Sequence, residues 1–241
     1  MKLSPSSINL FKNNPALWVL KEYYQIRTPS GDPAMRGKLV EDGLNAFLQG
    51  TSYEECVDLA HDYWEEPEQR LEITNYLDTA LLAIQEFCDS EPEQQLHIEC
   101  EIEGVYVHGY LDYSFEDKCV DLKTTNKLPK LLTSNAKLGQ LPAAKMDNIR
   151  QQAIYNIATG KPQYLAYVSP DDYYIHEVQE AEYQRGLDSV KELVTKMKEL
   201  NSMTEEQRLV WTAPFVEKLY NHFFVPADIY HKATEIWNGH I

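Results

Sequence analysis

GVYVHGYLDYSFEDKCVDLK, residues 104–123, predicts a β-hairpin and is the stretch around which the rest of the chain is organised. Aromatic and β-branched residues fill both halves of the stretch, as is typical of strands, and the dipeptide Glu-Asp at 116–117 lies between them. If this dipeptide forms the loop, counting back along both strands places Asp112 directly opposite Asp121.

In the predicted hairpin, Asp112 and Asp121 would repel each other unless a positive charge lies nearby. Facing residues on adjacent strands have their β-carbons about 4.5–5.5 Å apart, where like charges are destabilising. Lys123 is two positions beyond Asp121, so the alternation of side chains along a strand returns it to the same face. Two interpretations stay open from the hairpin alone. It is either an exposed face neutralised by its lysine or a site at which a metal cation offsets the repulsion.

The composition is that of a globular protein. The chain has 241 residues, 43% hydrophobic and 25% charged, which suits one elaborated domain. Its apolar runs are far shorter than the roughly 20 residues of a membrane helix, and MKLSPSSINLF lacks the regions of a signal peptide, so we expect a cytoplasmic protein without a membrane partner. The four cysteines show no Cys-x-x-Cys spacing and are expected to be buried small hydrophobes.

The net charge of −16 is unevenly distributed along the chain. Residues 54–103 contain sixteen acids and one base, whereas residues 118–150 contain seven bases and two acids. A basic island directly after the acidic pair is a local electrostatic footprint of the kind that binds phosphate, although lysines are also common on solvated surfaces.

Periodicity and capping signals divide the chain into three parts of a single domain, 1–241. Residues 1–93 predict helices with an acidic insertion at about 52–93, residues 94–178 predict the sheet, and residues 179–241 predict a helical extension. Asp32-Pro33 predicts the start of a helix that contains Glu41. Gln151 and Tyr155 are four apart on one face of a later helix.

These pieces together resemble the PD-(D/E)XK nuclease superfamily, specifically its RecB-like branch, which includes phage and bacterial recombination exonucleases. The resemblance covers residues 4–170, and its motifs occur in the family's order. They are Ser4-Pro5-Ser6-Ser7-Ile8-Asn9-Leu10-Phe11 with Asn14-Pro15, Arg36-Gly37 leading to Glu41, Gly109-Tyr110-Leu111-Asp112, Asp121-Leu122-Lys123-Thr124, and Gln151-x-x-x-Tyr155. The resemblance implies an α/β restriction-endonuclease-like core, with a central mixed sheet flanked by helices.

The resemblance also implies roles for individual residues. Asp112, Asp121, the Leu122 carbonyl and Glu41 would hold metal, the last directly or through water. Lys123 would orient or deprotonate the attacking water, and Gln151 with Tyr155 would hold Lys123 and the DNA backbone in place. Candidate phosphate contacts are Arg36, Thr124, Lys127, Lys130, Lys137, Lys145 and Arg150.

The chemistry explains why these residue types belong together. Phosphodiester cleavage builds charge on the attacking and leaving oxygens, which cations held by carboxylates neutralise. Two carboxylates 4 Å apart at an effective dielectric constant of about 20 repel by roughly 4 kcal/mol, and a divalent cation removes that conflict.

Two departures from the family pattern restrict which metal cofactors we expect. Glu41 stands where many RecB-like members carry a histidine ligand, and an all-oxygen site favours Mg²⁺, or Mn²⁺. The cysteines do not match the iron-sulfur pattern of the CRISPR-associated relatives, so we expect no cluster.

The resulting hypothesis is a metal-dependent DNA exonuclease of recombination and repair or phage DNA metabolism. DNA would be its substrate, and a single-strand annealing protein or a helicase are candidate partners. The alternatives are a nuclease-fold module that binds nucleic acid or a helicase without cutting, and a plain acidic interaction protein.

Overall fold

The computed structural model describes residues 1–129, 144–220 and 225–239. The strands are β1 (Lys2–Leu3), β2 (Glu93–Ile102), β3 (Val105–Ser114), β4 (Cys119–Thr124), β5 (Gln163–Val168) and β6 (Tyr173–Glu177). The helices are α1 (Pro5–Asn13), α2 (Pro15–Tyr23), α3 (Asp32–Leu48), α4 (Tyr53–His61), α5 (Pro67–Gln85), α6 (Met146–Thr159), α7 (Glu180–Ser202), α8 (Glu205–Thr212), the 3₁₀ turn η1 (Ala213–Phe215), α9 (Glu217–Tyr220) and α10 (Ala227–Asn238). None of the helices in these three ranges combines the length and apolar character needed to span a membrane.

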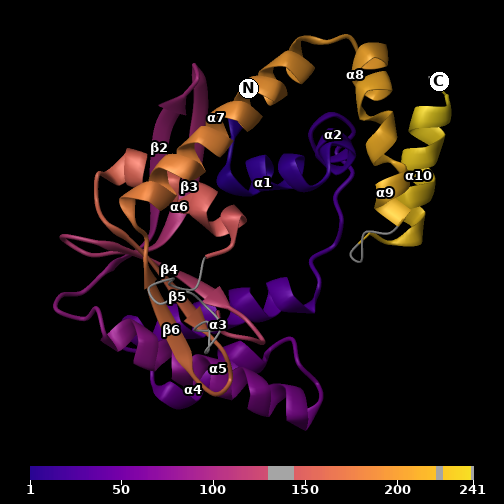
Figure 1. Ribbon diagram of the computed structural model, residues 1–241. Coiled ribbons are helices and arrows are strands. Elements are labelled where there is room, and N and C mark those ends of the chain that lie inside the picture. Colours follow the sequence, from indigo (N-terminus) through magenta and orange to yellow (C-terminus); the bar gives the residue numbers. More distant parts are fainter. Residues whose placement is uncertain (130–143, 221–224, 240–241) are drawn as a thin grey trace, which may run out of the picture.

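The strands form one mixed sheet in the order β1-β3-β4-β5-β6, with β2 paired to β3 (Figure 1). The β3–β4 and β5–β6 pairs are antiparallel, whereas β4–β5 and β1–β3 are parallel. Helix α6 provides the crossover between the parallel strands β4 and β5. The expected mixed α/β architecture with a central sheet flanked by helices is therefore confirmed.

The register of the β3–β4 hairpin follows the prediction. Phe115 N–H donates to the Lys118 carbonyl at 2.9 Å across the Glu-Asp loop, and Ser114 pairs with Cys119. The next position beyond the recorded pairs sets Asp112 across from Asp121. The carboxylates are thus brought together by the hairpin itself.

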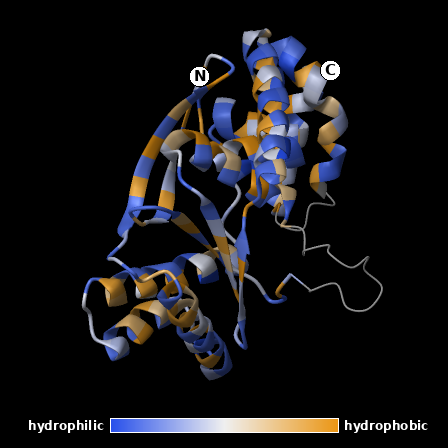
Figure 2. Cartoon of the chain, turned by 60° about the vertical axis from the view of Figure 1, so that its left-hand side comes forward, coloured by the Kyte–Doolittle hydropathy of each residue, from blue (hydrophilic) through white to orange (hydrophobic). Residues whose placement is uncertain are grey.

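Helices cover the sheet from two sides and form two main hydrophobic clusters. Helices α3, α4 and α5 pack against the ends of β3 and β4 and against β5 and β6, and the other cluster joins α1, α2, α6 and α7 with β2, β3 and the C-terminal helices (Figure 1). The alternation of hydrophilic and hydrophobic residues is visible as bands along the long β2–β3 strands (Figure 2). Residues from near both ends of the chain, Leu3 and Trp237, lie in the same cluster.

Capping residues account for most of the helix boundaries. The Ser4 hydroxyl accepts from Ser7 N–H at the start of α1, and Ser52 with Glu55 forms the expected capping box of α4. Helix α6 ends at Gly160, whose φ of 68° is left-handed. Helix α3 begins at Asp32-Pro33 as predicted, with Gly31 at its N-cap position and without a side-chain cap.

The acidic segment 52–93 corrects the expectation of a solvated insertion. Ile73, Leu77 and Ile84 recur at helical spacing and are buried in the cluster that covers the sheet, so α5 is part of the core and presents its acids outward. The expectation that all cysteines are buried also needs correction, because Cys88, just beyond the end of α5, is exposed.

Helices α6 and α7 cross closely at Gly186. A β-carbon there would lie 2.7 Å from the Ile149 carbonyl, which is shorter than any real contact of this kind. Only a glycine therefore allows α7 to press α6 against the sheet, where polar side chains of α6 reach β3 and β5.

Candidate functional site

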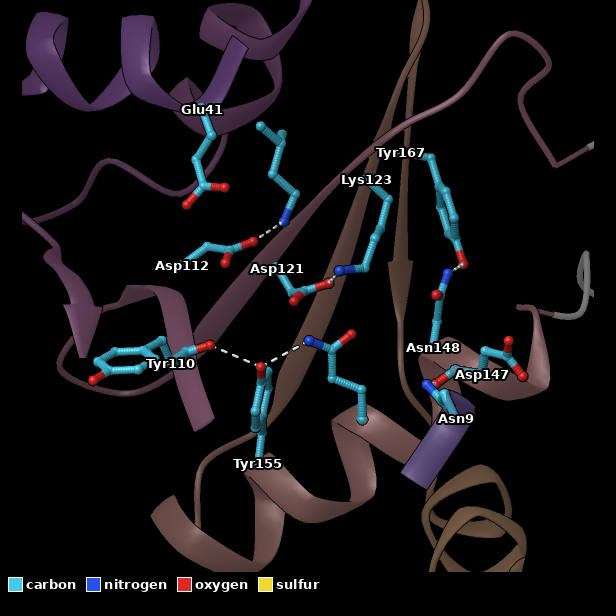
Figure 3. Close-up of polar contacts among 12 residues, drawn as sticks. Asn9, Glu41, Tyr110, Asp112, Asp121, Lys123, Asp147, Asn148, Tyr155 and Tyr167 are labelled. Atoms are coloured by element: carbon cyan, nitrogen blue, oxygen red, sulfur yellow. Dashed lines mark hydrogen bonds and ion pairs between the residues drawn. The ribbon is translucent and has the colours of Figure 1, made fainter. Parts of the chain in front are cut away.

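Asp121 is the most enclosed charged group of the hairpin. Its side chain is fully buried, and Lys123 Nζ lies 2.5 Å from Asp121 Oδ2 (Figure 3). Within the described residues, Asp121 Oδ2 faces the Lys123 ammonium, whereas Oδ1 has no hydrogen-bond donor in good geometry. A fully buried carboxylate with so few donors is costly, so its oxygens are well suited to binding a cation.

Asp112 and Glu41 complete a group of three carboxylates around Lys123. Asp112 Oδ2 accepts a hydrogen bond from the Leu122 N–H at 2.8 Å, so the main chain of β4 binds the Asp112 carboxylate. Glu41 reaches the site from α3 and points toward Asp112 in Figure 3. Its carboxylate accepts a hydrogen bond from the Gln95 amide of β2.

The electrostatics of the group are those of crowded acids. Burial, followed by the charge of Asp121, raises the pKa of Glu41 to about 7 and raises the pKa of Asp112 well above its usual range. Burial also raises the pKa of Asp121, against the lowering effects of Lys123 and Gln152. Burial lowers the pKa of Lys123, but the neighbouring carboxylates outweigh it and the net shift is upward.

We expect the free energy of unfolding of the metal-free protein to fall as the pH rises through the interval set by Glu41. Its pKa is about 7 in the folded state against a usual 4.5, so between these values the folded protein holds a proton that the unfolded chain has released. The stabilisation is complete below the lower value and is lost as the pH rises through the upper one, at most about 3 kcal/mol. Urea unfolding in EDTA, carried out at several pH values between about 4.5 and about 7, measures this change in the free energy of unfolding. Glu41→Gln should remove this part of the slope, and identical slopes for both proteins would contradict the assignment.

A divalent cation fits the residues present. Among the described residues, no three Asp, Glu, His or Cys side chains lie close enough to enclose a metal ion by themselves. Mg²⁺ does not require such a cage, since it is usually bound by one or two carboxylates and keeps several waters for exchange with substrate phosphate. Asp112 and Asp121 could supply the carboxylates, and Glu41 could act through water.

Gln151 and Tyr155 form a chain of hydrogen bonds that ties α6 to β3. Gln151 Nε2 donates to Tyr155 Oη at 2.7 Å, and Tyr155 Oη donates to the Tyr110 carbonyl at 2.7 Å (Figure 3). Burial raises the pKa of Tyr155, so it remains a neutral donor. In the described part of the chain neither side chain hydrogen-bonds to Lys123, so their contact to the site runs through β3, two residues before Asp112.

A pocket of about 300 Å³ opens beside Lys123. Four residues of the expected site line it, namely Lys123, Thr124, Lys127 and Lys145. Among the described residues, no Asp or Glu contributes to the lining. The loop after β4 is held by the Thr125 hydroxyl, which donates to the Lys127 carbonyl at 2.9 Å. On a chain of net charge −16, a pocket lined by three lysines, of which Lys123 is paired with Asp121, has the local charge that suits an anion.

The remaining candidate cations lie elsewhere. Arg150 is buried, and its guanidinium donates to Asn9, Asp147 and Ser189, which leaves it no free donor face for phosphate. Arg36 donates to Asn126 at 2.6 Å and lies over the Tyr76 ring, so it braces the loop after β4 without lining the pocket. Lys130 and Lys137 lie outside the described residues.

Sequence reasoning missed four polar residues that surround the site. Tyr167 is the β5 partner of Lys123 in the parallel register, and Asn148 donates to its hydroxyl at 2.9 Å at the edge of the pocket. Gln152 is fully buried, and its amide lies close enough to Asp121 to lower the pKa of that carboxyl group. Gln95 has a left-handed φ of 51° within a strand. Nothing in the sequence indicates the left-handed φ of Gln95. Gln152, in contrast, is the neighbour of Gln151, which the sequence analysis had already selected as a candidate.

Comparisons with known proteins indicate the family and the fold. A family model described as PD-(D/E)XK nuclease superfamily matches residues 2–228. A crystal structure from Eubacterium rectale, described as "Putative exonuclease", matches with a TM-score of 0.54 at 15% identity and covers 81% of this chain and 79% of that chain. The structure of SSO0001 matches with a TM-score of only 0.30 at 15% identity, over 72% of this chain and 82% of that one. No curated protein sequence matches the chain.

Proposed function

The chain belongs to the PD-(D/E)XK nuclease superfamily, and from this premise we propose that it is a divalent-metal-dependent DNA exonuclease. The observation that carries the proposal is the convergence of Asp112, Asp121 and Lys123 at one hairpin, with the Asp121 carboxylate fully buried beside the Lys123 ammonium. A module that only bound nucleic acid would have no use for a lysine beside two acids.

Each residue of the group has a proposed role. Asp112 and Asp121 would bind the cation, with Glu41 completing the shell directly or through water and the Leu122 carbonyl as a further ligand. The cation, when bound, would neutralise charge that develops on the phosphate oxygens. Lys123 would orient or deprotonate the attacking water and offset charge on the phosphate. Mg²⁺ is the proposed ion because the donors are oxygens, with Mn²⁺ as its substitute.

The α6 residues would act as positioning groups. Gln151 and Tyr155 hold the main chain of β3 next to Asp112, and this contact would fix the carboxylate relative to Lys123. The acid-free pocket beside Lys123 would take the phosphate that follows the cleaved bond, with Thr124, Lys127 and Lys145 as its contacts. Lys130 and Lys137 remain proposed contacts on the same basic segment.

Action at a strand end is proposed from the charge distribution. An acidic body with a small basic area can hold a short length of backbone but offers no long positive track for gripping duplex DNA. The protein from Eubacterium rectale with a similar fold is described as "Putative exonuclease". We propose that the chain acts in recombination, repair or phage DNA metabolism, with a single-strand annealing protein or a helicase as its partner.

We expect the protein to release acid-soluble nucleotides from a linear duplex but not from the same DNA as a covalently closed circle. A closed circle offers no terminus, so only internal cutting could degrade it. The measurement follows soluble nucleotides over time in Mg²⁺, with an EDTA reaction as the control. Degradation of the circle would overturn the exonuclease assignment but leave the metal site in place. Binding of DNA without any cleavage in Mg²⁺ or Mn²⁺ would instead support the silent binding module.

A further inference from the structure

A second acid-free basic pocket lies between α1, α2 and the segment that leads to α3. It has a volume of about 410 Å³, within the range of small-ligand sites. Its apolar lining comes from Leu10, Leu17 and Ile26. Two cations and three hydroxyl groups also line it, namely Lys21, Arg27, Ser6, Thr28 and Ser30. An apolar surface beside cations and hydroxyls matches a nucleotide, which has a flat apolar base and a charged phosphate.

The segment that carries Arg27 is folded back onto α2 by specific contacts. Ile26 N–H donates to the Leu20 carbonyl at 3.0 Å, and Gln25 adopts a left-handed φ of 56° to make that turn. The Gln25 amide donates to the Glu22 carbonyl at 3.1 Å. Arg27 and Lys21 are therefore brought to the same pocket by the main chain.

The cations of this pocket are available to a ligand. Arg27 is exposed, and no hydrogen bond or ion pair engages its guanidinium within the described ranges. Lys21 has one acidic neighbour, Glu22, at 3.6 Å, and both side chains are about one-third exposed. Such a pair contributes little and is easily exchanged for a phosphate contact.

Helix α1 connects this pocket to the proposed cleavage site. Ser6 and Leu10 line the α1–α2 pocket, whereas the neighbouring face of α1 holds the start of α6 through Asn9 and Asn13, which donate to Asp147. Lys145, which caps that start of α6, lines the pocket beside Lys123. The α1–α2 pocket is thus linked through α1 to the start of α6, where Lys145 lines the pocket beside Lys123, and a helix with its side chains is about 10–12 Å across.

We propose that the α1–α2 pocket binds a nucleotide unit of the substrate strand a few nucleotides away from the scissile phosphate. The base packs on Leu10, Leu17 and Ile26, and Arg27 with Lys21 binds the adjoining phosphates. This inference rests on the proposed function, since it names a second contact of the same substrate. It assigns a binding role to residues outside the carboxylate centre and the basic island.

The test compares Lys21→Ala/Arg27→Ala with Arg185→Ala/Lys232→Ala, a control that removes two exposed charges from α7 and α10. Fluorescence anisotropy in EDTA, where no strand is cut, measures binding of single strands of about four and about twelve nucleotides. We expect the first variant to bind the longer strand about tenfold more weakly and to flatten the salt dependence of log K by about 1.4. The control should match the wild type, and the shorter strand should lose less affinity than the longer one.

Three outcomes separate this inference from the proposed function. Equal binding by the two double variants would overturn the second subsite while leaving the nuclease assignment intact. A wild-type protein that binds neither strand and cleaves no DNA would overturn the proposed function itself. Saturation of the pocket by free deoxyadenosine monophosphate with the affinity of the longer strand, abolished in Lys21→Ala/Arg27→Ala, would identify a free-nucleotide site and overturn the strand contact.

Discussion

Replacing Asp121 with Asn is expected to abolish cleavage and metal binding together. The substitution keeps the shape of the side chain but removes the charge of Asp121, the fully buried carboxylate of the group, which faces the Lys123 ammonium. Metal stabilisation of developing charge is worth several kcal/mol, so cleavage should fall by roughly a thousandfold or more. Calorimetry with Mg²⁺ and the Mg²⁺-induced rise in melting temperature measure the loss of binding.

The matched control is Asp117→Asn, in the loop of the same hairpin, where the side chain is exposed and pairs with Lys118. This variant should keep both cleavage and the Mg²⁺-induced rise in melting temperature. If Asp121→Asn retained Mg²⁺ affinity, Asp121 would not be a ligand, and the buried carboxylate would have only a structural role with Lys123.

Lys123→Ala is expected to lose cleavage to a similar extent while keeping the metal. The ammonium group lies 2.5 Å from Asp121 and is attracted by all three carboxylates, so in the metal-free protein it competes with a cation for them. Its removal should leave Mg²⁺ affinity unchanged or higher, although turnover disappears. Single-turnover cleavage and calorimetry on the same preparation separate the two effects.

Lys118→Ala is the control for this substitution, since Lys118 belongs to the same hairpin but pairs with Asp89 and Asp117 at its loop end. Lys118→Ala should leave the rate of single-turnover cleavage and the Mg²⁺ affinity near the wild-type values. Loss of metal binding in Lys123→Ala to the same degree as in Asp121→Asn would show that Lys123 holds the carboxylates in place and has no separate part in the reaction.

The sequence was sufficient to predict the elements that carry the carboxylates. Strand alternation and the position of the Glu-Asp loop determine the register, and the register alone brings Asp112 next to Asp121. Helix caps at Ser4, Ser52 and Gly160 are local chemistry of the same kind. Such features depend on residues a few positions apart, which is why a single sequence predicts them.

Contacts between distant segments could not be predicted in this way. Gln95 meets Glu41 only because β2 turns out of its extended conformation beside α3. Arg150 sits in the basic island, as a phosphate contact would, but α6 packs against α1 and α7, and that packing surrounds its guanidinium with three partners. Charge and position along the chain say nothing about which face of a helix becomes buried.

Strand β3 belongs to both main hydrophobic clusters, and Asp112 stands at the point where it passes from one to the other. Leu111 packs with the N-terminal and C-terminal helices, whereas Tyr113 packs with α3, α4 and α5. The carboxylate is tied to β4 by the Leu122 N–H, so its position depends on how β3 and β4 lie against each other. A cavity on either side of the sheet that shifted β3 relative to β4 is therefore expected to disturb the proposed metal site.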